Sequence, residues 1–148
     1  MADADTALAW PLASFHVAAL LVAGLTTLYA VGALGSLLQG VRTVTGLALY
    51  LALWGLTRWT VGRWLRAAAL DASRDALLGA ATWGAVTGVG FLFAVLVTLG
   101  VVVREFVFVA VLALVGTPVA ALVGGVVGVG FAFLDTLLVR LGTRFGAA

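Results

Sequence analysis

Cysteine, lysine, isoleucine and asparagine do not occur in this sequence of 148 residues, and only 9% of its residues are charged. Without cysteine, the chain can form no disulfide, no thiolate nucleophile and no cysteine-ligated metal site. Soluble domains carry roughly 25% charged residues. Together with a hydrophobic share of 64%, this scarcity of charge indicates that lipid, and not water, surrounds most of the chain.

The few basic residues are all arginines, and eight of them stand against six acidic residues for a net charge of +2. Nucleic-acid binding needs a dense basic surface, so we expect no nucleic-acid partner. Residues 1–5 are acidic, and the apolar segment after them is too long for a cleaved signal peptide. We therefore expect the first helix to remain in the mature protein.

Uncharged runs long enough to cross a bilayer occur at residues 6–41, 76–103 and 106–134. A hydrocarbon core of ~30 Å needs ~20 apolar residues in a helix. A fourth run, between Arg42 and Arg58, is shorter, so these arginines must extend their heads toward the membrane surface. The sequence predicts a single all-α domain over residues 1–148, a polytopic membrane protein with four transmembrane helices. The predicted spans are residues 11–36, 42–64, 76–102 and 106–134.

Local signals place the ends of these helices and one bend. Pro11 suits the first turn of the first helix. Asp71 or Ser73 can cap the third helix, because both side chains accept hydrogen bonds from free backbone N–H groups. Pro118 removes a backbone donor inside the fourth helix and predicts a kink there.

Residues 135–146 predict a short C-terminal amphipathic helix that lies along the membrane. Leu137, Leu138, Leu141 and Phe145 recur at helical spacing, whereas Arg140 and Arg144 occupy other faces. This separation of apolar and charged faces is typical of helices at the membrane surface.

The arginines also predict an orientation, because cytoplasmic connections carry the excess of positive charge. Arg42 and Arg104 fall on one side of the predicted membrane. The other side holds six arginines: Arg58, Arg63, Arg66, Arg74, Arg140 and Arg144. We therefore predict a multi-pass protein of the cell membrane with both termini in the cytoplasm.

A glycine motif occurs twice, since residues 84–93 and 124–133 both read GxxxGxGFxF. If the last two helices form an antiparallel hairpin, Gly84 lies level with Gly125, and Gly79 with Gly130. Small residues let membrane helices approach closely, so we interpret these glycines as packing residues. The alternative is that they line a pore or form a hinge in an oligomer. The glycines in question are Gly79, Gly84, Gly88, Gly90, Gly124, Gly125, Gly128 and Gly130.

Four polar residues are candidates for a functional role: His16, Arg104, Glu105 and Asp135. His16 is most simply a polar residue that reaches the interface from the start of the first helix, and a proton switch is the alternative. At the turn between the last two helices, Arg104 and Glu105 are most simply an exposed ion pair that contributes little to stability. The alternative is that these two residues have a role in gating or recognition. Asp135 can pair with an arginine of the second helix, Arg58 or Arg63, and so fix the helix register.

Groups that catalysis or coupled transport needs are missing. The five serines and threonines nearest the helix ends have no histidine within sequence reach, no pair of carboxylates frames a cleft, and no His/Asp/Glu cluster has metal-ligand spacing. We expect neither an enzyme nor a cofactor or metal. No ionisable group falls at the predicted bilayer midplane, where ion-coupled transporters keep such groups, so active transport is not expected.

The last predicted span contains one family resemblance. Residues 117–137, from Thr117-Pro118 through the glycine motif to Asp135-Thr136-Leu137, resemble the pore helix of the small-conductance mechanosensitive channels. In that family a glutamine usually precedes the Asp-Thr, where this sequence has Phe133-Leu134. The resemblance implies a pore helix and an oligomeric channel.

Two functions therefore follow from the sequence. The first is a non-catalytic accessory, scaffold or interaction subunit that works through helix packing. The second is an oligomeric channel with the glycine-rich helices lining its pore, in which Thr82, Thr87, Thr98 and Thr117 face a wet lumen. In the packing interpretation the same threonines bond to neighbouring helices. The expected partners are membrane lipid and either further copies of the chain or another membrane protein.

Overall fold

The chain is all helical, as the sequence predicts. The computed structural model describes residues 2–40, 42–67 and 73–145, and these ranges contain no strand. The helices are α1 (Ala2–Ala30), α2 (Leu34–Gly40), α3 (Thr43–Ala67), α4 (Arg74–Val103) and α5 (Phe106–Phe145). Three of them contain segments long and apolar enough to cross a membrane: Ala9–Ala30, Arg74–Val102 and Phe106–Leu138. The fourth long helix, α3, carries Arg58, Arg63 and Arg66 and is not among these.

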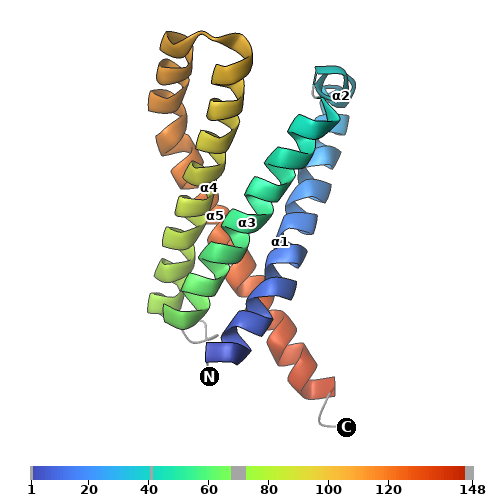
Figure 1. Cartoon of the computed structure of the whole chain (residues 1–148). Helices are drawn as coiled ribbons and strands as arrows, with labels where there is room; N and C mark the ends of the chain where they lie inside the picture. The colour runs from blue at the N-terminus through green and yellow to red at the C-terminus, as the bar shows by residue number, and fades with distance from the viewer. Residues whose placement is uncertain (1, 41, 68–72, 146–148) are drawn as a thin grey trace.

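The four long helices form two antiparallel hairpins (Figure 1). One hairpin pairs α1 with α3 through the short α2, and the other pairs α4 with α5. The hairpins lie close together at the end that holds the N-terminus, where α3 packs on α4, and they diverge toward the other end. The first residues of α1 and the last of α5 lie toward the same end.

The first helix differs from its predicted bounds at both ends. It begins at Ala2, which puts Pro11 inside the helix instead of in its first turn, and it ends at Ala30 instead of at residue 36. Gly32 ends it by adopting a left-handed conformation, with φ of 72°. The N–H groups of Gly32 and Ala33 donate to the carbonyls of Tyr29 and Leu28 at 3.0 and 2.9 Å. Hydrogen bonds of this kind to the last carbonyls of a helix are typical of a C-terminal cap at a glycine with positive φ.

The turns around α4 follow the sequence signals. Ser73 caps this helix by accepting a hydrogen bond from the N–H of Ala76 at 3.2 Å, whereas the other candidate cap, Asp71, lies outside the described residues. The reversal between α4 and α5 falls at Arg104 and Glu105, as predicted. Arg104 has a left-handed backbone, with φ of 59°, and its N–H bonds to the carbonyl of Gly100 at 2.9 Å.

The predicted tail is not a separate helix, because α5 continues without a break from Phe106 to Phe145. Nothing between Phe133 and Thr136 stops a helix, and the Thr136 hydroxyl donates to the carbonyl of Ala132 within the same helix. At 1.5 Å per residue, 40 residues extend about 60 Å, which is well beyond a hydrocarbon core of ~30 Å. The last turns of α5 extend beyond the other helices in Figure 1.

Glycines set the distance between α4 and α5. A methyl group built on Gly84 would overlap the carbonyl oxygen of Gly124 and lie 2.8 Å from the Cα of Gly128. One built on Gly88 would overlap the carbonyl oxygen of Ala120, and Gly124 and Gly128 meet α4 in the same way. The backbones of the two helices therefore touch without side chains between them, as small residues allow in membranes.

The remaining glycines of the two motifs have other neighbours. Gly84 lies between Gly124 and Gly128, whereas Gly125 faces the carbonyl of Ala81 at ordinary contact distance. Two glycines of α4 face α3, where Gly79 lies against Trp64 and Gly90 against Leu56. No described atom lies within 4 Å of a methyl group built on Gly130, so the expected pairing of Gly79 with Gly130 does not occur.

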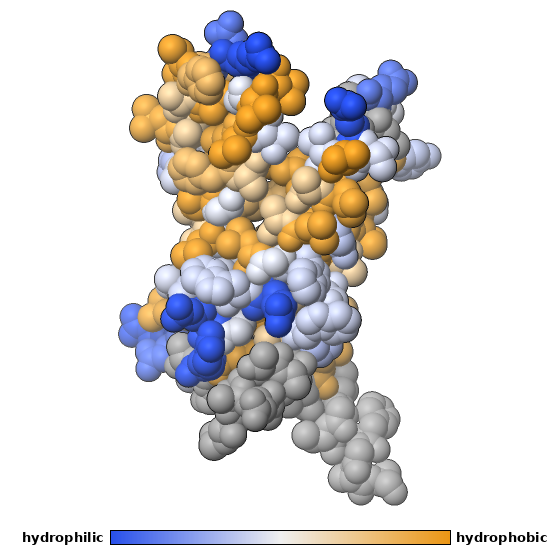
Figure 2. All heavy atoms as spheres, viewed as in Figure 1, coloured by the Kyte–Doolittle hydropathy of each residue, from blue (hydrophilic) through white to orange (hydrophobic). Residues whose placement is uncertain are grey.

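Large apolar side chains cover the outside of the bundle. Val101, Val107, Leu114 and Val126 are all exposed, and Figure 2 shows an apolar band between two hydrophilic rims. Contiguous exposed apolar surface of this extent is typical of a membrane or protein interface. With three candidate spans, this surface supports a protein that crosses the membrane.

Alanine replacements at the glycines test the contact between α4 and α5. Gly88→Ala and Gly128→Ala should each lower the free energy of unfolding by about 1 to 3 kcal/mol, because the new methyl group forces two backbones apart. Thermal unfolding in detergent micelles measures this effect.

Gly130→Ala is the matched control for Gly128→Ala. Gly130 lies two residues after Gly128 on α5, and a methyl group there meets no described atom within 4 Å. It should leave stability unchanged or raise it by up to ~1 kcal/mol through helix propensity. Equal stability of all three variants would contradict the close contact.

Candidate functional site

A cavity of about 590 Å³ lies inside the bundle, and all four long helices contribute to its walls. Most of its lining is aliphatic or aromatic, with Leu53, Leu92 and Phe91 among the larger side chains. It is partly open, and its lining includes Leu21 and Val123, which are themselves exposed. Both residues belong to candidate membrane spans.

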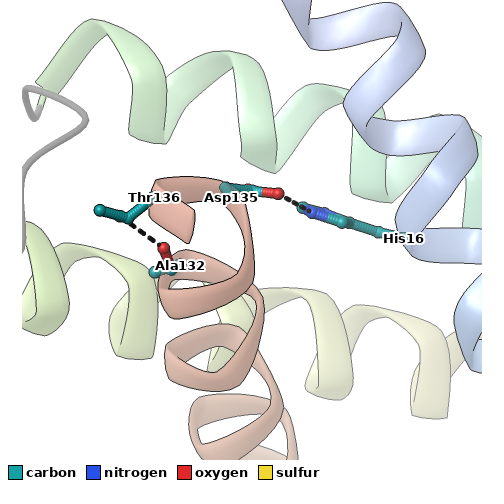
Figure 3. A network of polar contacts seen from close by, with 4 residues as sticks. All are labelled: His16, Ala132, Asp135 and Thr136. Carbon is teal, nitrogen blue, oxygen red and sulfur yellow. Dashed lines mark hydrogen bonds and ion pairs between the residues drawn. The ribbon is translucent and has the colours of Figure 1, made fainter. Parts of the chain in front are cut away.

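A buried contact between a histidine and an aspartate joins the two hairpins at this cavity. The Nε2 atom of His16 on α1 lies 3.1 Å from the Oδ1 atom of Asp135 on α5 (Figure 3). His16 is 5% exposed and Asp135 only 1%. The imidazole ring also stacks on Phe131, one turn before Asp135, with 4.1 Å between ring centroids. Such a contact gains strength from the low dielectric around it.

The neighbours of His16 and Asp135 in sequence are buried too. Ala13 and Val17, on either side of His16 along α1, are almost completely buried. Ala132 is buried on α5 in the same way. The His16 and Asp135 side chains therefore meet from helix faces that are turned toward the interior of the bundle.

The contact corrects two expectations. His16 does not reach for the membrane surface but faces the interior of the bundle. Asp135 pairs with this histidine and not with Arg58 or Arg63. The guanidinium groups of these arginines lie over the rings of Trp54 and Trp59, one turn earlier on α3, at 5.7 and 5.6 Å from the ring centroids. Cation–π contacts of this kind hold the arginines at exposed positions.

Among the residues that line the cavity, two buried polar atoms have no partner in the described part of the chain. These are the Oδ2 atom of Asp135, next to the oxygen that His16 binds, and the hydroxyl oxygen of Thr57 on α3. Both residues line the cavity. A buried polar group without a hydrogen bond costs about 1 to 3 kcal/mol, so native structures rarely leave one unused. The cavity thus presents two polar groups that a bound molecule can satisfy.

Other polar side chains around the cavity are already bonded. Thr60 of α3 and Thr87 of α4 share a hydrogen bond of 2.8 Å. The indole N–H of Trp64 donates to the carbonyl of Ala76, which joins α3 to the start of α4. The hydroxyls of Thr82, Thr98 and Thr117 donate to carbonyls of their own helices. Of the four threonines named in the two functional interpretations, only Thr87 bonds to another helix in the described part of the chain.

The remaining candidate residues lie elsewhere. Arg104 and Glu105 are exposed at the hairpin turn, at the end of the molecule away from the N-terminus (Figure 1). No ion pair joins them within the described ranges. Over those ranges no three His, Asp or Glu residues gather in a way that could hold a metal. His16 and Asp135 therefore form the polar centre of the site, without a metal cluster around them.

Sequence reasoning missed Thr57, Thr60 and Phe131 as site residues. Thr57 and Thr60 stand between Leu53 and Trp64, and this 53, 57, 60, 64 spacing marks one face of a helix. A threonine on an inward face needs a partner, so this pattern could have indicated polar contacts inside the bundle. The contact of His16 with Phe131 and Asp135 had no comparable signal, because it joins residues more than a hundred positions apart.

Comparison with known proteins identifies the family of the chain. Residues 5–147 match a family of unknown function, DUF7965, and the chain belongs to that family. No curated protein and no solved structure matches it.

A double-mutant cycle tests the coupling of the two hairpins. His16→Ala and Asp135→Ala should each lower the free energy of unfolding by about 3 to 5 kcal/mol, because either change leaves a buried polar partner alone. The double variant should lose less than the sum, by about 0.5 to 3 kcal/mol. Asp75→Ala, at an exposed carboxylate, is the control and should change little. Strictly additive losses would show that the two side chains do not depend on each other.

Proposed function

We propose that the chain is a non-catalytic integral membrane protein that holds a small membrane-soluble molecule in the cavity between its two hairpins. The observation that carries this proposal is the combination of an apolar cavity with two unpaired, buried polar atoms, Asp135 Oδ2 and Thr57 Oγ1. Ligand sites are commonly apolar pockets of about 300 to 1,000 Å³ with a few polar groups that orient the ligand. In this role the chain serves as a binding or accessory subunit and not as an enzyme.

The glycine contacts support packing over pore lining. Gly84, Gly88, Gly124 and Gly128 face the partner helix of their own hairpin, so their surfaces are already used within one chain. A pore lined by these faces would require the hairpin to open. Further copies of the chain, or another membrane protein, would instead contact the exposed outer faces of α4 and α5. The interaction role thus concerns a different surface from the glycine motifs.

We propose four membrane crossings, with α3 as the fourth. Both α1 and α4 contain candidate spans, and both run from the end that holds the N-terminus toward the opposite end (Figure 1). The direction of α3, which returns between them, supports this proposal. With 25 residues, α3 is about 37 Å long, which is enough to cross a hydrocarbon core. Its arginines then lie in the half nearer the N-terminal end.

We further propose the cell membrane as the location, with both termini in the cytoplasm. This orientation rests on the six arginines at the N-terminal end against two at the other end. Since the chain has no cysteine, single cysteines can report the side of the membrane. The matched pair Asp75→Cys and Glu105→Cys replaces one exposed acidic residue at each end and leaves the arginines unchanged.

An impermeant thiol reagent, added outside intact cells, should label Glu105→Cys and spare Asp75→Cys until the membrane is opened. Labelling of Asp75→Cys from outside, with Glu105→Cys protected, would reverse the proposed orientation. Labelling of both from outside would contradict an intact bundle in a single orientation.

Retention of a ligand tests the binding function. The protein purified in mild detergent should carry a non-covalent adduct in native mass spectrometry. Val127→Phe enlarges a side chain of the cavity lining and should abolish the adduct. Val126→Phe, the next residue on an exposed face, should keep it. If Val127→Phe retains the adduct as well as the unchanged chain does, the ligand lies elsewhere and the proposal fails.

A further inference from the structure

The chemistry of the cavity defines the kind of molecule it takes. We infer that the ligand is a neutral lipid-soluble alcohol or phenol, whose hydroxyl donates a hydrogen bond to Asp135 Oδ2 while its apolar body fills the cavity. This inference rests on the proposed binding function and adds the head group to it. Neither the scaffold nor the channel interpretation assigns a ligand to this place.

The free carboxylate oxygen is an acceptor, so the ligand must supply a donor. His16 Nε2 and Asp135 Oδ1 share one hydrogen bond, and Oδ2 has no partner among the described residues. Whether the shared proton sits on nitrogen or on Oδ1, Oδ2 keeps its lone pairs and accepts. An ether, a ketone or a hydrocarbon would bury this oxygen without satisfying it, and that desolvation is unfavourable.

The number of free polar atoms favours a hydroxyl over an ammonium group. An ammonium group has three N–H donors, whereas two polar atoms of the described lining lack a partner, Asp135 Oδ2 and Thr57 Oγ1. A donor left without an acceptor in an apolar interior is unfavourable. A hydroxyl brings a single donor, which Asp135 Oδ2 can accept.

Thr57 can bind the same kind of head group. Its buried hydroxyl also has no described partner, and a threonine hydroxyl both donates and accepts. An alcohol oxygen that donates to Asp135 can still accept from a second hydroxyl. The leucines, valines and phenylalanines of the remaining lining suit a hydrocarbon or ring system. The partly open side gives a long chain room to continue into the bilayer.

A photoactivatable hexadecanol, added to vesicles that contain the full-length protein, tests the inference. Illumination should attach the probe to peptides of the cavity lining. Unlabelled hexadecanol should compete with the probe about tenfold better than hexadecyl methyl ether, because the ether leaves the buried carboxyl oxygen without a hydrogen bond. The two competitors differ mainly in the donor hydrogen.

Two variants locate the head group. Asp135→Asn can still accept from His16 through its carbonyl, and its amide N–H then faces the cavity, so the preference for alcohol over ether should disappear or reverse. Thr57→Val has the same shape without the hydroxyl and should weaken competition by hexadecanol severalfold without lowering thermal stability. Thr82→Val, at an exposed threonine of α4, should behave as the unchanged protein. If Asp135→Asn does not fold, Thr57→Val still tests the site.

The outcomes separate the two proposals. Equal competition by hexadecanol and its methyl ether would overturn the head-group inference, as expected if water occupies the free acceptor, while the binding function would stand. An unchanged preference in Asp135→Asn, together with unchanged competition by hexadecanol in Thr57→Val, would also overturn it. Failure of both compounds to protect the cavity peptides would remove the proposed function together with the inference.

Discussion

The contact between α4 and α5 is the constraint on which the rest of the structure depends. Lipid offers helices no hydrophobic reason to associate, so close backbone contact must hold the hairpin together. Four glycines, Gly84, Gly88, Gly124 and Gly128, provide that contact. With this distance fixed, α5 crosses α4 and then passes behind α3 and α1 in the view of Figure 1. The continuation carries Asp135 to His16, so a packing motif in one hairpin determines where the polar centre forms between the two hairpins.

The polar centre and the cavity serve different structural needs. Hydrogen bonds between Thr60 and Thr87, and from Trp64 to Ala76, hold the hairpins at one end. The His16–Asp135 contact joins them again through α1 and α5. Between these fixed points the side chains do not fill the interior. A tightly packed bundle would have no reason to keep a carboxylate oxygen and a threonine hydroxyl unpaired, whereas a binding site needs such groups to orient what it holds.

Hydropathy and turn chemistry were enough to predict most of the fold. The uncharged runs placed α4 and the start of α5 within two residues, the hairpin turn was predicted from local signals, and Ser73 was one of the two candidate caps. The failures involve contacts distant in sequence. The tail was expected at the membrane surface because its faces are amphipathic, but α5 simply continues. Asp135 was assigned to an arginine because opposite charges attract, while the actual partner depends on how α1 and α5 cross, which no local pattern records.

The proposed ligand would enter the cavity from the hydrocarbon region, because the exposed lining residues Leu21 and Val123 belong to candidate membrane spans, and this route determines which concentration governs occupancy. A ligand that enters from the bilayer equilibrates with its mole fraction in the lipid and not with its level in water. A sparingly soluble compound can then saturate the site even when its bulk aqueous concentration is negligible, because partitioning has already removed it from water. A weak intrinsic affinity of the cavity would therefore be enough for a ligand to fill it. The ligand would exchange between cavity and bilayer as fast as it diffuses laterally in the membrane. The protein would in effect measure the composition of its own membrane.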